Sequence, residues 1–245
     1  MLQYGFDTPE VRCRSVVTIG SFDGVHQGHR ALLEHLKAMA RRMDAESVVV
    51  TFDPHPRIAM GRAEGMQLLT TIEERARLLD EVGIDRMVVA HFDDKFREQS
   101  FEEFVRGSLV AKLGMRGMVV GYNHRLGRGS EGSYDSLVPL GEKLGFRVER
   151  VEQFTASGCK ISSTVVRNLF DEGNVERACE ILGHRYVVMG EAIEGELNIK
   201  DEYKLIPADG EYSVNILGHG ERVVSIVNGK ILVDKHLSGK IILEF

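Results

Sequence analysis

The alternation of short β-branched runs with segments of helical periodicity is the feature that most constrains the fold of this chain. Apolar strands are expected at residues 16–20, 48–52, 87–90, 118–121 and 147–151, and helices at 28–43, 72–82, 101–113 and 135–144. Strands this apolar, each followed by a helix, predict an α/β fold with a parallel sheet covered on both faces. Ligands of such sheets bind beyond the carboxyl ends of the strands.

The pattern changes after about residue 182, where short β runs replace the helical periodicity. Asn228-Gly229 stands between two of these runs and predicts a type I′ hairpin. We therefore expect a first domain of residues 1–184 and a second of residues 185–245, a small antiparallel β module.

Composition excludes several classes of protein. The net charge of −6 over 245 residues argues against nonspecific binding of nucleic acid. Three cysteines without a C-x-x-C spacing indicate a reducing compartment, and none is expected to be catalytic. We expect neither secretion nor a membrane span, since no apolar run approaches the roughly 18 residues that a span needs. The expected location is the cytoplasm, and the oligomeric state stays open.

The segment Gly-Ser-Phe-Asp-Gly-Val-His-Gln-Gly-His at residues 20–29 falls where the first strand ends and the first helix begins. Helix N-termini attract anions, because their N–H groups lack partners and the dipole there is positive. The spacing of three places His26 and His29 on one face of the first turn. Gly24 and Gly28 let a phosphate approach the backbone. The segment therefore predicts a phosphate site.

Two alternatives for this segment stay open. It contains neither a Walker loop nor the dinucleotide fingerprint G-x-G-x-x-G. A metal site formed by His26, His29 and Asp23 would need a further ligand, and two surface histidines at a helix cap are the other possibility. The glycines and the preceding apolar strand favour the phosphate site over both.

Two further segments follow strands and so face the same edge of the sheet. Residues 51–56 read Thr-Phe-Asp-Pro-His-Pro, and we predict a rigid wall of the ligand pocket formed by Phe52, Pro54, His55 and Pro56. The alternative is a rigid turn with a solvated histidine. Residues 121–129 form a glycine-rich loop that includes Arg125, a residue type suited to phosphate, although a flexible basic loop has the same composition.

Three hydroxyl residues precede a helical run near residue 165. Ser162, Ser163 and Thr164 sit at the N-cap position, and Arg167 follows one turn later. Capping requires one hydroxyl, so three hydroxyls with an arginine suggest a polyphosphate site. Capping alone, with a surface arginine, is the alternative.

These groups together fit catalysis by positioning. A nucleophilic phosphate is already ionised and needs no general base, whereas the attacked phosphorus and the leaving pyrophosphate need their charge neutralised. The histidine pair, the hydroxyl cluster and Arg167 would supply that neutralisation. Mg²⁺ would bridge the triphosphate and keep most of its waters.

The combination of these motifs resembles a known family. His-x-x-His after a strand with Ile-Ser-Ser-Thr-x-x-Arg is similar to the nucleotidylyltransferase superfamily. The longer forms GSFDGVHQGH, TFDPHP, ISSTVVRNL and GNVERACEILGHRY resemble the bacterial bifunctional riboflavin kinase/FAD synthetases over residues 16 to about 186. The resemblance implies a Rossmann-like domain that joins ATP and FMN, with Mg²⁺, to give FAD and pyrophosphate.

The resemblance also implies roles for individual residues. It implies catalytic roles for His26, His29 and Arg167 and an acceptor site that includes Asn123 and Arg125 beside the wall at Phe52. Contacts with ATP are expected at eight positions: Gly20, Phe22, Asp23, Gly24, Gly28, Ser162, Ser163 and Thr164.

Two departures from the family pattern change the expectations. The family's loop after the fourth strand carries aromatic residues, where this chain has His124 and Leu126. Its kinase barrel carries a GFPTAN-like motif, whereas this chain contains no Pro-Thr dipeptide. Residues 190–195 and 207–214 still resemble strands of that barrel. We therefore expect a reduced barrel without riboflavin kinase activity.

Three functions compete at this point. The first is FMN adenylyltransferase, and the second is a nucleotidylyltransferase for another phosphorylated alcohol, suggested by the lost aromatic positions. The third is a catalytically weak protein that binds nucleotide or flavin and acts through partners. The intact set of His26, His29 and Arg167 argues against the third, because binding alone does not require all of these groups.

Overall fold

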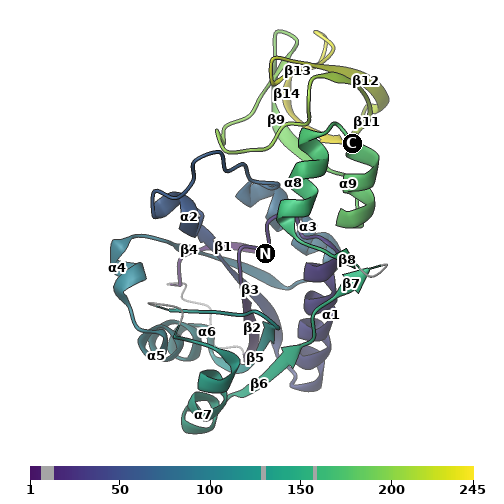
Figure 1. Cartoon of the computed structure of the whole chain (residues 1–245). Helices are drawn as coiled ribbons and strands as arrows, with labels where there is room; N and C mark the ends of the chain where they lie inside the picture. The colour runs from purple at the N-terminus through teal and green to yellow at the C-terminus, as the bar shows by residue number, and fades with distance from the viewer. Residues whose placement is uncertain (7–13, 128–130, 157–158) are drawn as a thin grey trace. The chain divides into compact units, whose positions relative to one another are not determined.

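The computed structural model describes residues 1–6, 14–127, 131–156 and 159–245, with the backbone alone at residues 155, 156, 159 and 160. The chain forms two compact units (Figure 1). The first comprises Met1–Phe22, His29–Glu64 and Leu78–Phe154, and the second Asp23–Gly28, Gly65–Arg77 and Thr155–Phe245. The boundary expected between residues 184 and 185 stays a prediction, and each unit is described separately below.

A six-stranded parallel sheet forms the first unit, in the order β1-β4-β3-β2-β5-β6. Its strands are β1 Leu2–Tyr4, β2 Ser15–Ile19, β3 Glu46–Asp53, β4 Arg86–His91, β5 Met115–Gly121 and β6 Arg147–Val151. The five strands expected from the sequence are all present, and the predicted α/β class is confirmed. The short edge strand β1 escaped prediction, since three residues give no periodic signal.

Helices cover both faces of this sheet (Figure 1). They are α1 Gln27–Arg42, α2 Pro56–Ala59, α3 Ile72–Val82, α4 Asp94–Glu98, α5 Phe101–Phe104, α6 Ala111–Leu113 and α7 Tyr134–Leu144. On one face Met39 of α1 packs so closely on Gly117 of β5 that a Cβ there would meet its Cε at 2.7 Å. On the other, Phe104 and Leu109 pack with Val17.

The predicted helix at 101–113 is present but not regular. A π-helical turn, Val105–Val110, separates α5 from α6. Gly107 lies inside this turn, and glycine has a low propensity for the α-helix. The hydrophobic periodicity predicted a helix over this segment but gave no sign of the π-helical turn within it.

The strand order places a topological switch point next to β2. This strand pairs with β3 on one side and with β5 on the other. The chain continues from β2 to β3 and β4 on one side and resumes with β5 on the other side of β2, and such folds bind ligands beyond the carboxyl end of the strand at this point. Residues 20–29 start at this end.

The second unit is built on a closed antiparallel barrel, which confirms the predicted β module. Its strands are β9 Val187–Ile193, β10 Glu196–Asn198, β11 Gly210–Ile216, β12 Gly220–Val227, β13 Lys230–Leu232 and β14 Gly239–Glu244. Asn228 and Gly229 join β12 to β13 with φ values of 51° and 71°, as a type I′ turn requires. Asp209 accepts hydrogen bonds from both of their N–H groups.

Two helices and a short hairpin belong to the same unit as the barrel. The hairpin is β7 Thr155–Ala156 with β8 Cys159–Lys160, and the helices are α8 Ser163–Asp171 and α9 Val175–Leu182. Phe170 of α8 and Leu182 of α9 are buried in one apolar cluster with Val188 and Leu243 of the barrel. The hydroxyl cluster before α8 is thereby fixed to the barrel core.

Within the described parts of the chain, every helix is too short or too polar to span a bilayer. Cys179 is half-buried and forms no disulfide. Cys13 and the side chain of Cys159 lie outside the described residues, so the expectation that no cysteine is catalytic stays a prediction.

Candidate active site

The loop after β2 has an unusual backbone. Phe22, Gly24 and Val25 have φ values of 47°, 82° and 41°. Aromatic and β-branched residues rarely adopt positive φ, and such strain persists where the surrounding structure enforces it, often at functional sites. Gly24 has no room for a side chain, because a Cβ there would lie 2.7 Å from Leu69 Cδ1. The loop is therefore shaped before any ligand binds.

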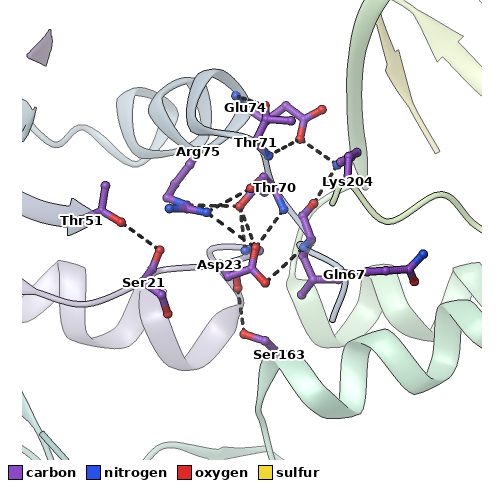
Figure 2. A network of polar contacts seen from close by, with 12 residues as sticks. Ser21, Asp23, Thr51, Gln67, Thr70, Thr71, Glu74, Arg75, Ser163 and Lys204 are labelled. Carbon is purple, nitrogen blue, oxygen red and sulfur yellow. Dashed lines mark hydrogen bonds and ion pairs between the residues drawn. The ribbon is translucent and has the colours of Figure 1, made fainter. Parts of the chain in front are cut away.

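Contacts at its first residues hold the loop to the sheet. The Gly20 N–H donates to Val50 O at 3.1 Å, and the Thr51 hydroxyl donates to Ser21 O at 3.2 Å (Figure 2). The backbone here is thus pinned to β3, the neighbour of β2.

His26 is buried, with 6% of its surface exposed. Burial lowers its pKa to about 4, against opposing effects that include the carboxylate of Asp23, while His184 lowers it further. The ring is therefore neutral at pH 7 and can donate one N–H. Gly28 makes room for it, since a Cβ there would lie 3.3 Å from the ring.

His29 lies in the first turn of α1, and His26 directly precedes this helix, so the expected common face of the two histidines stays a prediction. Its ring is tilted against that of Phe22, with the ring centroids 5.1 Å apart. Phe22 is itself buried, so it is an apolar support for the imidazole. The predicted ATP contact by Phe22 stays a prediction.

Asp23 is the centre of a dense polar network (Figure 2). Its Oδ1 accepts from the backbone N–H and the hydroxyl of Thr70, at 2.9 and 3.2 Å. Its Oδ2 accepts from Leu69 N at 3.1 Å and from Arg167 Nη2 at 2.6 Å. The guanidinium of Arg75, also buried, is 3.8 Å away. Both carboxylate oxygens are therefore engaged, and one charge holds two arginines.

The three hydroxyls before α8 have three different positions. Ser162 is the N-cap of α8 and accepts from Val165 N at 3.4 Å. The Ser163 hydroxyl donates to the carbonyl oxygen of Asp23 at 2.9 Å. Thr164 is exposed. Capping thus accounts for one hydroxyl, and a second ties α8 to the loop at Asp23.

Arg167 is held by two contacts on one side of its guanidinium. Its Nη2 donates to Asp23, and its Nε donates to Gln67 O at 2.6 Å. The side chain is 18% exposed, so part of it remains accessible to solvent. The structure thus brings Asp23, Ser163 and Arg167, which are far apart in the sequence, into direct contact.

The expected wall after β3 is an aromatic cluster. The ring of Phe52 meets those of Phe92 and Phe96 edge to face, at 5.6 and 5.5 Å. His55 Nδ1 accepts from Arg57 N at 3.2 Å and caps α2, which starts at Pro56. The peptide bond before Pro54 is cis. The segment is therefore a rigid turn beside an aromatic cluster, and its role as a wall of the ligand pocket stays a prediction.

In the loop after β5, Asn123 and Arg125 are exposed, whereas His124 is half-buried and Leu126 is buried. Burial lowers the pKa of His124 to about 4. Arg128, part of the basic loop expected here, lies outside the described residues. The two positions at which the family pattern has aromatic residues thus hold side chains that face the protein.

A surface hollow of about 600 Å³ lies beyond the carboxyl end of β4 and includes none of the predicted site residues. His91, Asp93, Lys95 and Glu103 give it a largely charged lining, and Phe96 connects it to the aromatic cluster. We place the chemistry at the loop after β2 instead, because the buried charges and the strained backbone gather there.

Comparison with known proteins now adds family evidence to this geometry. Residues 8–165 match the model of the FAD synthetase family. The chain belongs to the FAD synthetase family. The bifunctional riboflavin kinase/FMN adenylyltransferase of Escherichia coli (strain K12) is 33% identical over 224 residues, which are 87% of this chain and 71% of that protein. The enzyme of the same name from Listeria monocytogenes is 33% identical over 84% of this chain and 69% of its own length.

A crystal structure described as a macrolide-efflux protein from Streptococcus pneumoniae has a similar fold. It matches with a TM-score of 0.82 over 100% of this chain and 89% of that one, at 22% identity. At this identity the likeness supports the fold alone. Membership of the FAD synthetase family rests on the family model and the two enzymes above, and it makes the chain a nucleotidyltransferase.

Sequence reasoning missed five polar residues of this FAD synthetase that hold the loop: Thr70, Glu74, Arg75, His184 and Lys204. Thr71 and Glu74 form a capping box, a T-x-x-E pattern visible in the sequence. The pattern predicts the start of α3 but gives no sign that Glu74 is buried. The burial of Arg75 and Lys204 likewise has no sequence signal, since both residue types are mostly exposed.

Proposed function

We propose that this chain acts as an FMN adenylyltransferase, transferring AMP from ATP to FMN to give FAD and pyrophosphate. One observation carries the proposal: Asp23 joins the His26 loop to Ser163 and Arg167 through direct contacts. A positive group, hydroxyls and a helix N-terminus thus gather at the end of β2, where a triphosphate would bind.

In the proposed reaction a phosphate oxygen of FMN attacks the α-phosphorus of ATP. A new P–O bond forms, the bond to the β-phosphate oxygen breaks, and pyrophosphate leaves with the electron pair. The attacking phosphate is already ionised, so no protein base is required. The chain's contribution is alignment of the two substrates and stabilisation of the charge that develops in the transition state.

The residues proposed to stabilise the transition state differ in charge. His26 is neutral at pH 7 and supplies a fixed hydrogen-bond donor, whereas Arg167 supplies a permanent positive charge. His29 extends the donor set from the first turn of α1. The remaining ATP contacts, including Gly20, Gly28, Ser162 and Thr164, stay proposals of the same model.

Mg²⁺ enters this proposal as part of the substrate. Among the described residues, no group of three or more His, Cys, Asp or Glu side chains is placed to hold a metal ion. The carboxylate of Asp23 is fully engaged with N–H and O–H donors. An ion that arrives with ATP and is coordinated by phosphate oxygens and water fits these residues. The proposal keeps the expected location in the cytoplasm, where ATP is available.

The acceptor is the less constrained substrate. Phe52, Phe92 and Phe96 offer aromatic surface suited to a flat ring system, which supports a flavin. The inward-facing His124 and Leu126 support the second candidate, another phosphorylated alcohol. A direct experiment decides: the pure protein is incubated with ATP, Mg²⁺ and FMN, and FAD is measured by chromatography. Pyrophosphate release with a different acceptor, and none with FMN, would favour the second candidate.

We also propose that the barrel lacks riboflavin kinase activity. The link from β10 to β11 contains Pro207 followed by Ala208, so the chain has no counterpart of the Pro-Thr motif. Incubation with riboflavin and ATP is expected to give no FMN. Robust formation of FMN would refute this part of the proposal and leave adenylyl transfer untouched.

A further inference from the structure

The barrel unit contains a buried ion pair close to the loop at Asp23. Lys204 has no exposed side-chain surface, and neither has Glu74, its partner at 2.7 Å. The Lys204 ammonium also donates to Leu69 O and Val187 O, at 2.7 and 2.8 Å. An ammonium has three N–H bonds, so every one has an acceptor. Figure 2 shows this group beside the Asp23 network.

Glu74 ties the same ion pair to the barrel and to the start of α3. Its Oε1 accepts from Met189 N of β9 at 2.7 Å, and its Oε2 accepts from Thr71 N at 2.8 Å. Burial lowers the pKa of Lys204, and Glu74 opposes this effect. A buried pair of this kind adds little net stability compared with apolar residues of the same size. Stability alone therefore does not account for this ion pair, whereas the positioning of neighbouring residues can.

The peptide groups of Leu69 and Thr70 connect this pair to the loop. Leu69 donates its N–H to Asp23 and accepts from Lys204 at its carbonyl oxygen. The backbone of Leu68 donates its N–H to Tyr203 O at 2.6 Å and accepts from Leu205 N at 2.8 Å, so the segments on both sides of Lys204 are bonded to this residue. The Leu69 carbonyl and the Thr70 N–H belong to one peptide group, and hydrogen bonds in series polarise one another, so the ammonium strengthens the Thr70 N–H that donates to Asp23.

The cations of this network differ in exposure. Lys204 pairs with Glu74, and Arg75 and Arg167 pair with Asp23. Lys204 and Arg75 are buried, whereas the side chain of Arg167 is 18% exposed. Among these three cations, Arg167 is therefore the one that a phosphate can reach.

We propose that Lys204 and Glu74 are positioning residues for adenylyl transfer: they hold Leu69 and Thr70 against Asp23, and through Asp23 they fix Arg167 for the triphosphate. The inference rests on the proposed function and deepens it. It gives the barrel of this chain a task in the reaction at the β2 loop.

The chain offers a matched control for this pair. Glu73 adjoins Glu74 on α3 and pairs with Lys240 of β14 at 2.6 Å, again joining α3 to the barrel. Both of these side chains are more than half exposed, at 57% and 62%. Exposed pairs contribute little. The two pairs thus differ in burial and in contact with Leu69, but both join α3 to the part of the chain that forms the barrel, Lys204 in the link from β10 to β11 and Lys240 in β14.

The test is a double-mutant cycle on ligand affinity. The double variant Lys204→Met/Glu74→Gln removes both buried charges together, and Arg167→Ala removes the group through which they act. Affinity for α,β-methylene ATP with Mg²⁺, measured by calorimetry, is expected to fall on the order of 10-fold in the double variant. In the Arg167→Ala background the same change is expected to cost nothing further. Lys240→Met/Glu73→Gln is expected to leave affinity unchanged.

Several results would overturn the proposal. An equal loss with and without Arg167, or no loss in either background, would show that the pair does not act through that residue. If thermal unfolding shows that the double variant does not fold, Glu74→Gln alone enters the same cycle, since it keeps the side-chain size and one carbonyl acceptor. Wild-type protein that binds the analogue but makes no FAD from FMN would refute the proposed acceptor, and the affinity cycle would still decide on Lys204.

Discussion

The two sides of the proposed reaction are built differently. On the phosphate side, Asp23, Arg75 and Lys204 are buried, and each takes part in an ion pair with a carboxylate or a cation. On the acceptor side, in the first unit, Asn123 and Arg125 are exposed. We infer from this contrast that the triphosphate binds a preformed site, whereas the exposed residues of the acceptor side become ordered only when the acceptor binds. Changes to the buried ion pairs of the phosphate side are then expected to affect stability and rate together, and changes to the exposed residues of the acceptor side to affect affinity alone.

The largest effect is expected for Asp23→Ala. The change leaves the buried guanidinium of Arg75 without its carboxylate and frees Arg167 from its anchor. Breaking a buried ion pair by removing one partner costs about 3–5 kcal/mol. Chemical denaturation is expected to show a loss of this size, and FAD formation is expected to fall with it.

A carboxylate on the acceptor side provides the control. Asp93 caps α4 by accepting from Phe96 N at 2.7 Å, and among the described residues it pairs with no buried cation. Asp93→Ala is expected to cost about 1 kcal/mol, as loss of an N-cap does. Equal losses for Asp93→Ala and Asp23→Ala would contradict the contrast between the two sides.

His29→Ala is the next largest change. If the imidazole stabilises transition-state charge, its loss should lower kcat by roughly 10²-fold with little effect on folding. His35→Ala is the control on the same helix, since His35 bonds to Glu149 at 2.6 Å and lies farther along α1. A His29 variant with the wild-type rate would remove this residue from the mechanism.

The sequence predicted the parts of this site that follow a local rule. A strand end followed by glycines and a helix located the loop at residues 20–29, and an N-cap cluster located the start of α8. The type I′ turn at Asn228 was equally local. Each of these depends on backbone chemistry within a few residues, and each is present in the structure.

The missed features depend on long-range contacts. The bond from Arg167 to Asp23 spans 144 residues, and that from Lys204 to Glu74 spans 130. No periodicity marks a lysine that will be buried, because burial is decided by the segments that surround it. Strand β14 was missed for a related reason. It begins with the exposed residues Gly239 and Lys240, so the sequence gives little strand signal there, although the pairing of β14 with β9 closes the barrel.

Acid pH offers a third way to compare the two sides. His26 and His124 lie on different sides, and burial lowers the pKa of each from 6.5 to about 4. The unfolded chain therefore binds more protons between these values, so stability is complete above pH 6.5 and is lost as the pH falls toward 4. Each histidine is expected to cost about 1 kcal/mol between pH 6.5 and 5.5.

Glutamine variants separate stability from function here. His26→Gln and His124→Gln should both flatten the acid loss of stability, followed by denaturation at a series of pH values. Affinity for the ATP analogue should fall only in His26→Gln, since His124 belongs to the acceptor loop. If His124→Gln weakened ATP binding as much, the assignment of the loop after β5 to the acceptor would be wrong.

The smallest effect is expected for Arg125→Ala. Its guanidinium is exposed, so a contact with the acceptor's phosphate would be screened by water and contribute as little as a surface ion pair. We expect KM for FMN to rise about threefold, with kcat and the affinity for the ATP analogue unchanged. Arg116→Ala, an exposed arginine of β5, should leave KM as it is. A fall in kcat with no change in KM would instead mean that Arg125 acts in the transition state, and the acceptor side would then be as preorganised as the phosphate side.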